Sequence, residues 1–119
     1  MKKKMLVIED EKMWQDIIMD HHGEEFEIIQ AYSESETIQK FSENPDIAII
    51  LMGGSVCIGE TTVELIEELR PKFTGIMVGI SSSDKTNRLL FVAGRDCVIS
   101  KRNFELRKII DAYVSQGKL

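Results

Sequence analysis

The sequence predicts an α/β domain in which a five-stranded parallel sheet is sandwiched by five helices, a (βα)5 arrangement. Short apolar runs alternate with amphipathic segments along the chain, which is typical of parallel strands joined by helical crossovers. The 119 residues suit one domain spanning 1–119, and a content of 43% hydrophobic and 29% charged residues is that of a globular chain. No repeat or linker interrupts the pattern.

The elements of the first half follow from apolar runs and from the residues at their boundaries. The first run stops at the acids Glu9–Glu11, as a buried parallel strand stops at a sheet edge. Gly23 can end the helix that follows, Ser33 or Ser35 can cap the next helix, and Pro45 ends it. The first helix takes its apolar spacing from Met13, Trp14, Ile17 and Ile18. The predicted order is strand Lys4–Ile8, helix Lys12–His22, strand Phe26–Ala31 and a helix to Asn44.

The second half opens with the clearest strand, Ile47–Met52, whose uninterrupted apolar run predicts a central position with helices on both faces. A glycine-rich loop follows, and Thr61 or Thr62 begins a helix that Pro71 closes. The next helix starts from a Ser-Ser-Ser-Asp cap and ends at Gly94. The remaining elements are strand Ile76–Ile80, that helix with Leu89–Val92, strand Cys97–Ile99 and a last helix with Phe104, Leu106, Ile109, Ile110 and Tyr113.

Composition excludes several functional classes. A net charge of −5 disfavours nucleic-acid binding, and no apolar run approaches the roughly 20 residues of a membrane-spanning helix. Cys57 and Cys97 form no CxxC and have no nearby histidine pair, so we expect reduced thiols rather than zinc or a disulfide. The start Lys2–Lys4 lacks the apolar region of a signal peptide. We therefore expect a cytoplasmic protein that binds neither nucleic acid nor membrane.

Polar residues follow four of the predicted strands at their carboxyl ends, where parallel α/β sheets place their functional crevice. The segments at this edge are Glu9–Glu11, Met52–Gly54, Ser81–Ser83 and Ser100–Lys101.

With these residues the chain resembles, over essentially its whole length, the receiver domain of two-component response regulators, which has a flavodoxin-like fold. The resemblance runs from MLVIEDE near the start to AGRDCVISKRNF and implies the strand order 2-1-3-4-5. In that family an acidic pair holds Mg²⁺, an aspartate ending the third strand accepts phosphate, and a hydroxyl and a lysine contact the phosphoryl oxygens. By this resemblance the acidic pair is Glu9 and Asp10, the hydroxyl is Ser81 (or Ser82), and the lysine is Lys101.

The family's phosphoacceptor falls on Leu51, which can neither accept a phosphoryl group nor bind Mg²⁺. No Asp or Glu occurs from Ile47 to Gly59, so a shift in alignment does not restore the site. The family's aromatic switch residue is Val98 here, and the proline after the lysine is Arg102. The Met-Pro of the family's third loop is replaced by Gly54-Ser55.

These departures predict a pseudo-receiver: a phosphorylation-independent protein-interaction module of a two-component or phosphorelay pathway, and not an enzyme. We expect no cofactor, with Mg²⁺ bound weakly at most through Glu9 and Asp10, and a structural pairing of Lys101 with Asp10. The expected partner is a histidine kinase, an output domain or another regulator, and a homodimer stays open. The residues of the expected interaction face are Arg88, Arg95, Arg102, Arg107 and Lys108.

Two other functions stay open. A small-molecule or cofactor-binding flavodoxin-like domain would need a phosphate cradle, but the acids after the first strand repel phosphate and only the loop Gly53–Ser55 remains for it. A metal-dependent phosphohydrolase would need carboxylates from several strand ends, whereas one strand end supplies them here.

The remaining conspicuous residues have structural explanations. We expect His21 and His22 to be exposed at a helix end and Cys57 to be an ordinary loop thiol, since nothing basic flanks it. Met52 and Trp14 have the spacing of core residues.

Overall fold

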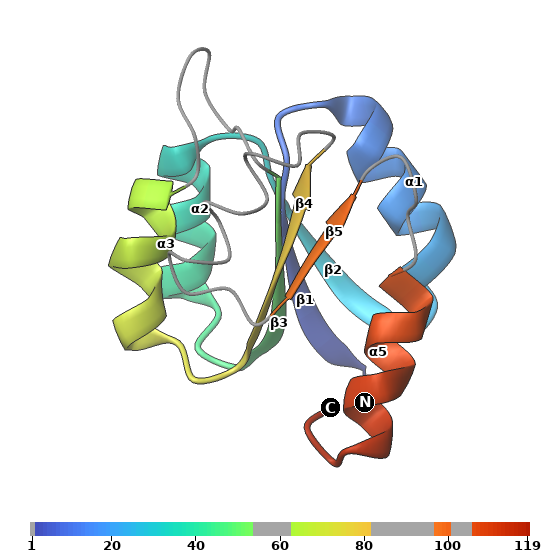
Figure 1. The fold of residues 1–119 in the computed structure, drawn as a ribbon. Helices are drawn as coiled ribbons and strands as arrows, with labels where there is room; N and C mark the ends of the chain where they lie inside the picture. The colour runs from blue at the N-terminus through green and yellow to red at the C-terminus, as the bar shows by residue number, and fades with distance from the viewer. Residues whose placement is uncertain (1, 54–62, 82–96, 101–105) are drawn as a thin grey trace.

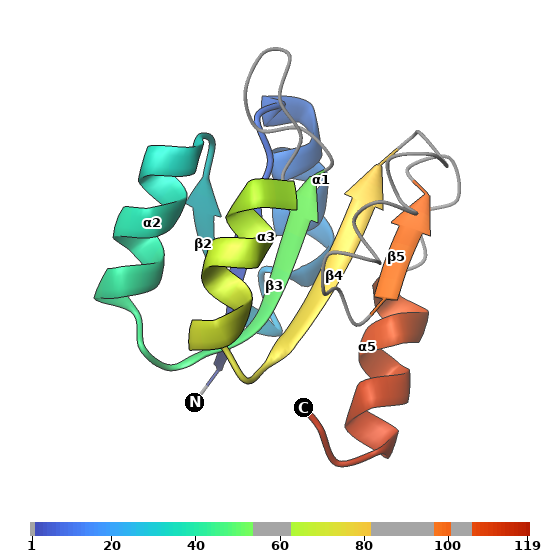
Figure 2. The same cartoon turned by 60° about the vertical axis from the view of Figure 1, so that its left-hand side comes forward.

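The computed structural model describes residues 2–53, 63–81, 97–100 and 106–119 of the chain. In it, five parallel strands form one sheet in the order β2-β1-β3-β4-β5, which confirms the predicted order (Figure 2). The strands are β1 Lys3–Ile8, β2 Phe26–Ala31, β3 Ile47–Gly53, β4 Ile76–Ser81 and β5 Cys97–Ser100.

Helices cover both faces of the sheet, with α1 and α5 on one side and α2 and α3 on the other (Figure 1). The helix predicted through Leu89–Val92, together with Thr61 and Thr62, lies outside the described residues. No helix of the described part of the chain is long and apolar enough to cross a membrane. The helices are α1 Lys12–His22, α2 Glu34–Glu43, α3 Val63–Leu69, a 3-10 turn Arg70–Lys72 and α5 Leu106–Ser115.

The helix ends show the predicted chemistry. The Ser33 hydroxyl accepts a hydrogen bond from the Glu36 backbone N–H, so Ser33 rather than Ser35 caps α2. Pro71 lies inside the 3-10 turn that finishes α3. After α5, Gly117 adopts φ 75°, where its N–H and that of Lys118 close the last turn as a Schellman motif.

The core lies on both faces of the sheet because successive strand residues point to opposite sides. In β1, Met5 and Val7 belong to a cluster with α1 and α5, whereas Leu6 and Ile8 belong to a cluster with α3. Both faces are therefore buried, which explains the uninterrupted apolar runs in the sequence.

On α1, the buried residues Gln15, Ile18 and His22 form the stripe that faces the sheet. Trp14 packs on the core as predicted, whereas Met13, which belongs to the same apolar helical spacing, is 57% exposed. The predicted exposure of His22 is wrong, because this residue continues the buried stripe at 3% exposure.

Candidate functional site

The acidic segment Glu9–Glu11 follows β1 directly, at the carboxyl edge of the sheet. Glu9 is buried at 2% exposure, while Asp10 and Glu11 are exposed. One carboxylate oxygen from each of the three residues lies within 4.8 Å of the others. The two residues of the predicted acidic pair therefore differ in exposure: Glu9 is buried and Asp10 lies in solvent.

Gln15 fixes the backbone beneath this segment, a role that the sequence analysis missed. Its Nε2 donates to the carbonyl oxygens of Val7 at 3.1 Å, Glu9 at 3.1 Å and Ala31 at 3.0 Å, and the side chain is fully buried. The Glu9 N–H donates in turn to the Ala31 carbonyl at 3.0 Å. One amide thus joins α1 to the ends of β1 and β2. The sequence signal is its spacing from Ile18 and His22 on one helix face.

Leu51, at the predicted acceptor position, is a core residue. It lies two positions before the end of β3, beside Val7 and Val78 of the neighbouring strands, and is fully buried. Its side chain belongs to the cluster on the face of α1 and α5. An apolar side chain therefore fills the position that the resemblance matches to the phosphoacceptor.

Gly53, on the same face of β3 as Leu51, is in close contact with Glu9. A Cβ on Gly53 would overlap the Glu9 carboxylate oxygen Oε2 and would lie 3.1 Å from Cδ. Glycine is required here by close approach, since φ is positive only at Gly117 among the described residues. The buried Glu9 carboxylate consequently lies across the end of β3, directly beyond Leu51 on that face.

The remaining predicted site residues are placed by backbone only or not described. Ser81 ends β4 and pairs in register with Ser100, and Val98 pairs with Gly79. Lys101, like Arg88, Arg95 and Arg102 of the expected interaction face, lies outside the described residues, as does Cys57. Met52 is fully buried, as predicted.

Arg107 and Lys108 are on the first turn of α5. The Arg107 guanidinium contacts Glu25 as an ion pair, lies 3.6 Å from Asp111, and is 3.2 Å from Nδ1 of His22. Its charge is therefore committed to contacts within the domain.

A divalent cation would find hard oxygen ligands in Glu9, Asp10 and Glu11, the donor type that Mg²⁺ prefers. All three come from one strand end, and Leu51 adds no oxygen from β3. The donor set fits a weakly held cation at the edge of the domain.

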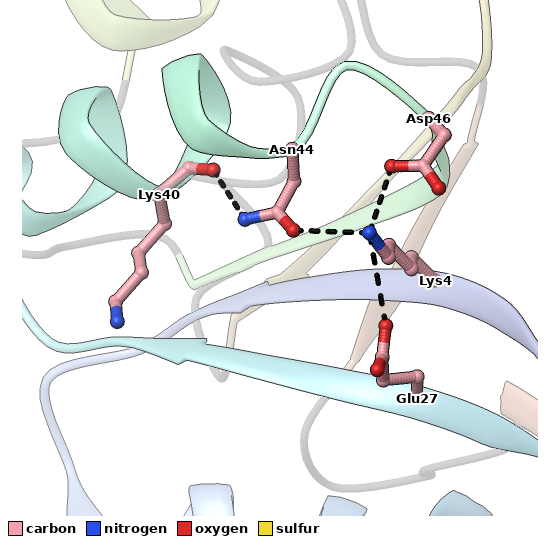
Figure 3. Close-up of polar contacts among 5 residues, drawn as sticks. All are labelled: Lys4, Glu27, Lys40, Asn44 and Asp46. Atoms are coloured by element: carbon pink, nitrogen blue, oxygen red, sulfur yellow. Dashed lines mark hydrogen bonds and ion pairs between the residues drawn. The ribbon is translucent and has the colours of Figure 1, made fainter.

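The opposite edge of the sheet holds a second polar cluster around Lys4 (Figure 3). The Lys4 ammonium donates to Asn44 at 3.2 Å and Asp46 at 2.9 Å and lies 3.9 Å from Glu27. The hydrogen bond from Lys4 holds the pKa of Asp46 below its ordinary value, and the same bond raises the pKa of Lys4. A cleft of about 670 Å³ opens beside this cluster, lined by Lys2, Lys4, Gly23, Phe26, Glu27, Ile28 and Asp46.

No family model matches the sequence, and no curated protein sequence matches it. Solved structures do match. A two-component response regulator from Clostridium difficile has a TM-score of 0.80 at 21% identity, over 97% of this chain and 94% of that chain. The N-terminal domain of the nisin resistance regulator NsrR has a TM-score of 0.79 at 21% identity, over 100% of both chains.

The BeF3-activated receiver domain of Klebsiella pneumoniae RstA has a TM-score of 0.79 at 16% identity, over 94% of this chain and 97% of that chain. Identities this low compare folds rather than sites. The agreement nevertheless covers nearly the full length of each domain, and the strand order is the one that the resemblance implied. The chain therefore has the α/β fold of these response-regulator receiver domains.

Proposed function

We propose that the chain is a pseudo-receiver, which acts by binding a protein partner and does not accept a phosphoryl group. The observation that carries the proposal is Leu51, a fully buried core residue at the position matched to the acceptor. The absence of Asp and Glu from Ile47 to Gly59 supports it, because no neighbouring side chain can take over the role.

The acidic residues are consistent with this function. Phosphoryl transfer to a carboxylate needs a cation placed between the acceptor and the transferring oxygens. Here the carboxylates of Glu9, Asp10 and Glu11 come from one strand end, so Mg²⁺ binding is weak at most and serves no transfer. Glu9 is buried against Gly53 with its backbone held by Gln15, which favours one fixed arrangement of this edge. Binding is then constitutive and depends on whether the partner is present.

The proposed partner is a protein of a two-component or phosphorelay pathway in the cytoplasm. Among the structures with this fold is the receiver domain of the yeast regulator Ssk1, crystallised with the histidine phosphotransfer protein Ypd1, at 17% identity and a TM-score of 0.74. The cations of the interaction face that the sequence predicts lie in the basic second half of the chain. Because Arg107 already binds Glu25 within the domain, we assign partner contacts to the other cations of that face.

The direct test is incubation with acetyl phosphate and Mg²⁺, followed by intact-mass measurement. We expect no added phosphoryl group, whereas a receiver with an intact acceptor, treated in the same tube, should be labelled. Denaturing the protein before the measurement removes noncovalently bound phosphate, so that only a covalent phosphoryl group adds mass. One phosphoryl group mapped to an aspartyl or glutamyl side chain would show that the proposal is wrong.

A further inference from the structure

His22 is a buried titratable residue that the proposed function does not use. It is the last residue of α1, is 3% exposed, and faces the first turn of α5. A cavity of about 270 Å³ adjoins it, lined by His21, His22, Leu106 and Arg107. Histidine is the side chain whose charge ordinarily changes between about pH 5 and pH 8.

The contact between His22 and Arg107 requires a neutral imidazole. A guanidinium can only donate hydrogen bonds, so Nδ1 of His22, at 3.2 Å from Nη2 of Arg107, is the acceptor and carries no proton. Protonation of Nδ1 would replace this hydrogen bond by two facing donors and two like charges.

The groups around His22 oppose protonation on balance. Burial is the main cause that lowers the pKa of His22, and the Arg107 charge and His21 lower it further, while Glu25 raises it. Asp111, on the next turn of α5, forms an ion pair with Arg107. The carboxyl end of α1 favours a cation, but it does not reverse the direction.

We propose that His22 and Arg107 form a proton-operated latch, which fastens the start of α5 to the end of α1 when His22 is neutral and releases it when His22 is protonated. The latch goes beyond the proposed function because it regulates the helix packing rather than the phosphoacceptor edge. Leu106 and Ile110 hold α5 in the core at 1% and 0% exposure, so release is local.

The direction in which pH changes the stability of this contact follows from the difference between the pKa of His22 in the folded and in the opened state. The ordinary pKa of His22 is 6.5 and the folded value is lower, so the unfolded or opened state binds the proton more tightly. The latch is therefore fully closed above about pH 6.5 and weakens as the pH falls toward the folded pKa. Carboxylates, which titrate near pH 4, contribute little in this window.

Hydrogen exchange of the full chain at about pH 7.5 and about pH 5.5, corrected for intrinsic rates, tests the latch. We expect the amides of α5 to lose protection several-fold at the lower pH while those of β1 and β3 keep theirs. His22→Gln keeps an acceptor oxygen for Arg107 but cannot be protonated, so its α5 should not respond to pH. His21→Gln, on the exposed neighbour, should keep the acid-induced loss of protection in α5.

Equal acid-induced loss in wild type and His22→Gln, or no loss in the wild type, would overturn the proposal. An independent variant covers the case in which His22→Gln does not fold. Arg107→Gln removes the facing cation from a half-exposed side chain, so the pKa of His22 measured by NMR titration should rise. An unchanged His22 titration in Arg107→Gln would equally overturn the latch.

Discussion

Glu9 and Gly53 depend on each other at the level of single side chains. The Glu9 carboxylate lies where a side chain at residue 53 would begin, and Gln15 holds the Glu9 carbonyl from below. An acid is thereby buried over the end of β3, although its neighbour Asp10 remains in solvent. Leu51 and Glu9, two of the residues that the resemblance relates to phosphoryl chemistry, are thus buried within the domain.

Gly53→Ala should displace the Glu9 carboxylate and destabilise the fold by about 1–3 kcal/mol, the usual cost of overpacking. The overlapping atom is the end of a flexible side chain, so the domain should still fold. Urea unfolding of Gly53→Ala, Glu9→Ala and the double variant measures the coupling between the two positions. We expect the alanine at 53 to cost much less in the Glu9→Ala background. An equal cost in both backgrounds would contradict the contact.

At the scale of secondary structure, three of the described helices have a recognisable local boundary residue. Ser33 caps α2, Gly117 closes α5, and Pro71 sits in the turn that ends α3. Lys4 makes a contact between segments far apart in the sequence, because its ammonium joins β1 to the end of α2 and to the start of β3 (Figure 3). Such a contact sets how neighbouring elements meet rather than whether each one forms.

The cluster around Lys4 should make stability depend on acid. The folded pKa of Asp46 is lowered from 3.8 by the hydrogen bond from Lys4, so its contribution is present above that value and is lost as the pH falls through the folded pKa. Lys4→Met should remove this part of the pH dependence. Urea unfolding at a series of acidic pH values measures it, and Lys3→Met, on the exposed neighbour in β1, serves as the control. Identical acid profiles for wild type and Lys4→Met would refute the assignment.

For the whole molecule, the sheet separates two apolar clusters, and Leu51 belongs to the one under α1 and α5. In the proposed pseudo-receiver, stability and the missing phosphoacceptor are connected, since the residue matched to the acceptor position also fills the core. Native domains have a net stability of only about 5–15 kcal/mol, so a charge at this position is a global perturbation.

Leu51→Asp should destabilise the domain by about 3–5 kcal/mol in the absence of metal, the range for an uncompensated buried charge. The new carboxylate would lie on the same strand face as Gly53, beneath Glu9, where Mg²⁺ could bridge the two. We expect Mg²⁺ to restore part of the thermal stability of Leu51→Asp. Leu51→Asn has the same shape without the charge and should respond much less. A flat Mg²⁺ titration of Leu51→Asp would mean that Leu51 does not border the acidic pocket.

The parallel α/β architecture could be predicted from the sequence alone, since the apolar runs of β1 to β5 and the helix boundaries of α1 and α2 reflect local periodicity and capping. The sequence also determined the absence of a carboxylate between Ile47 and Gly59, which needs no structure to establish. Which side chains within an element are buried depends on contacts between elements and could not be predicted from the sequence. Met13 is exposed, His22 is buried, and Glu9 is enclosed beside an exposed Asp10.

The physical reason is that local periodicity allows a helix to rotate by a residue at little cost, while contacts between distant segments fix the rotation. Arg107 meets His22 from 85 positions away, and Gly53 meets Glu9 across two neighbouring strands. These contacts exist only once the sheet order brings β1 beside β3 and the helices of one face together.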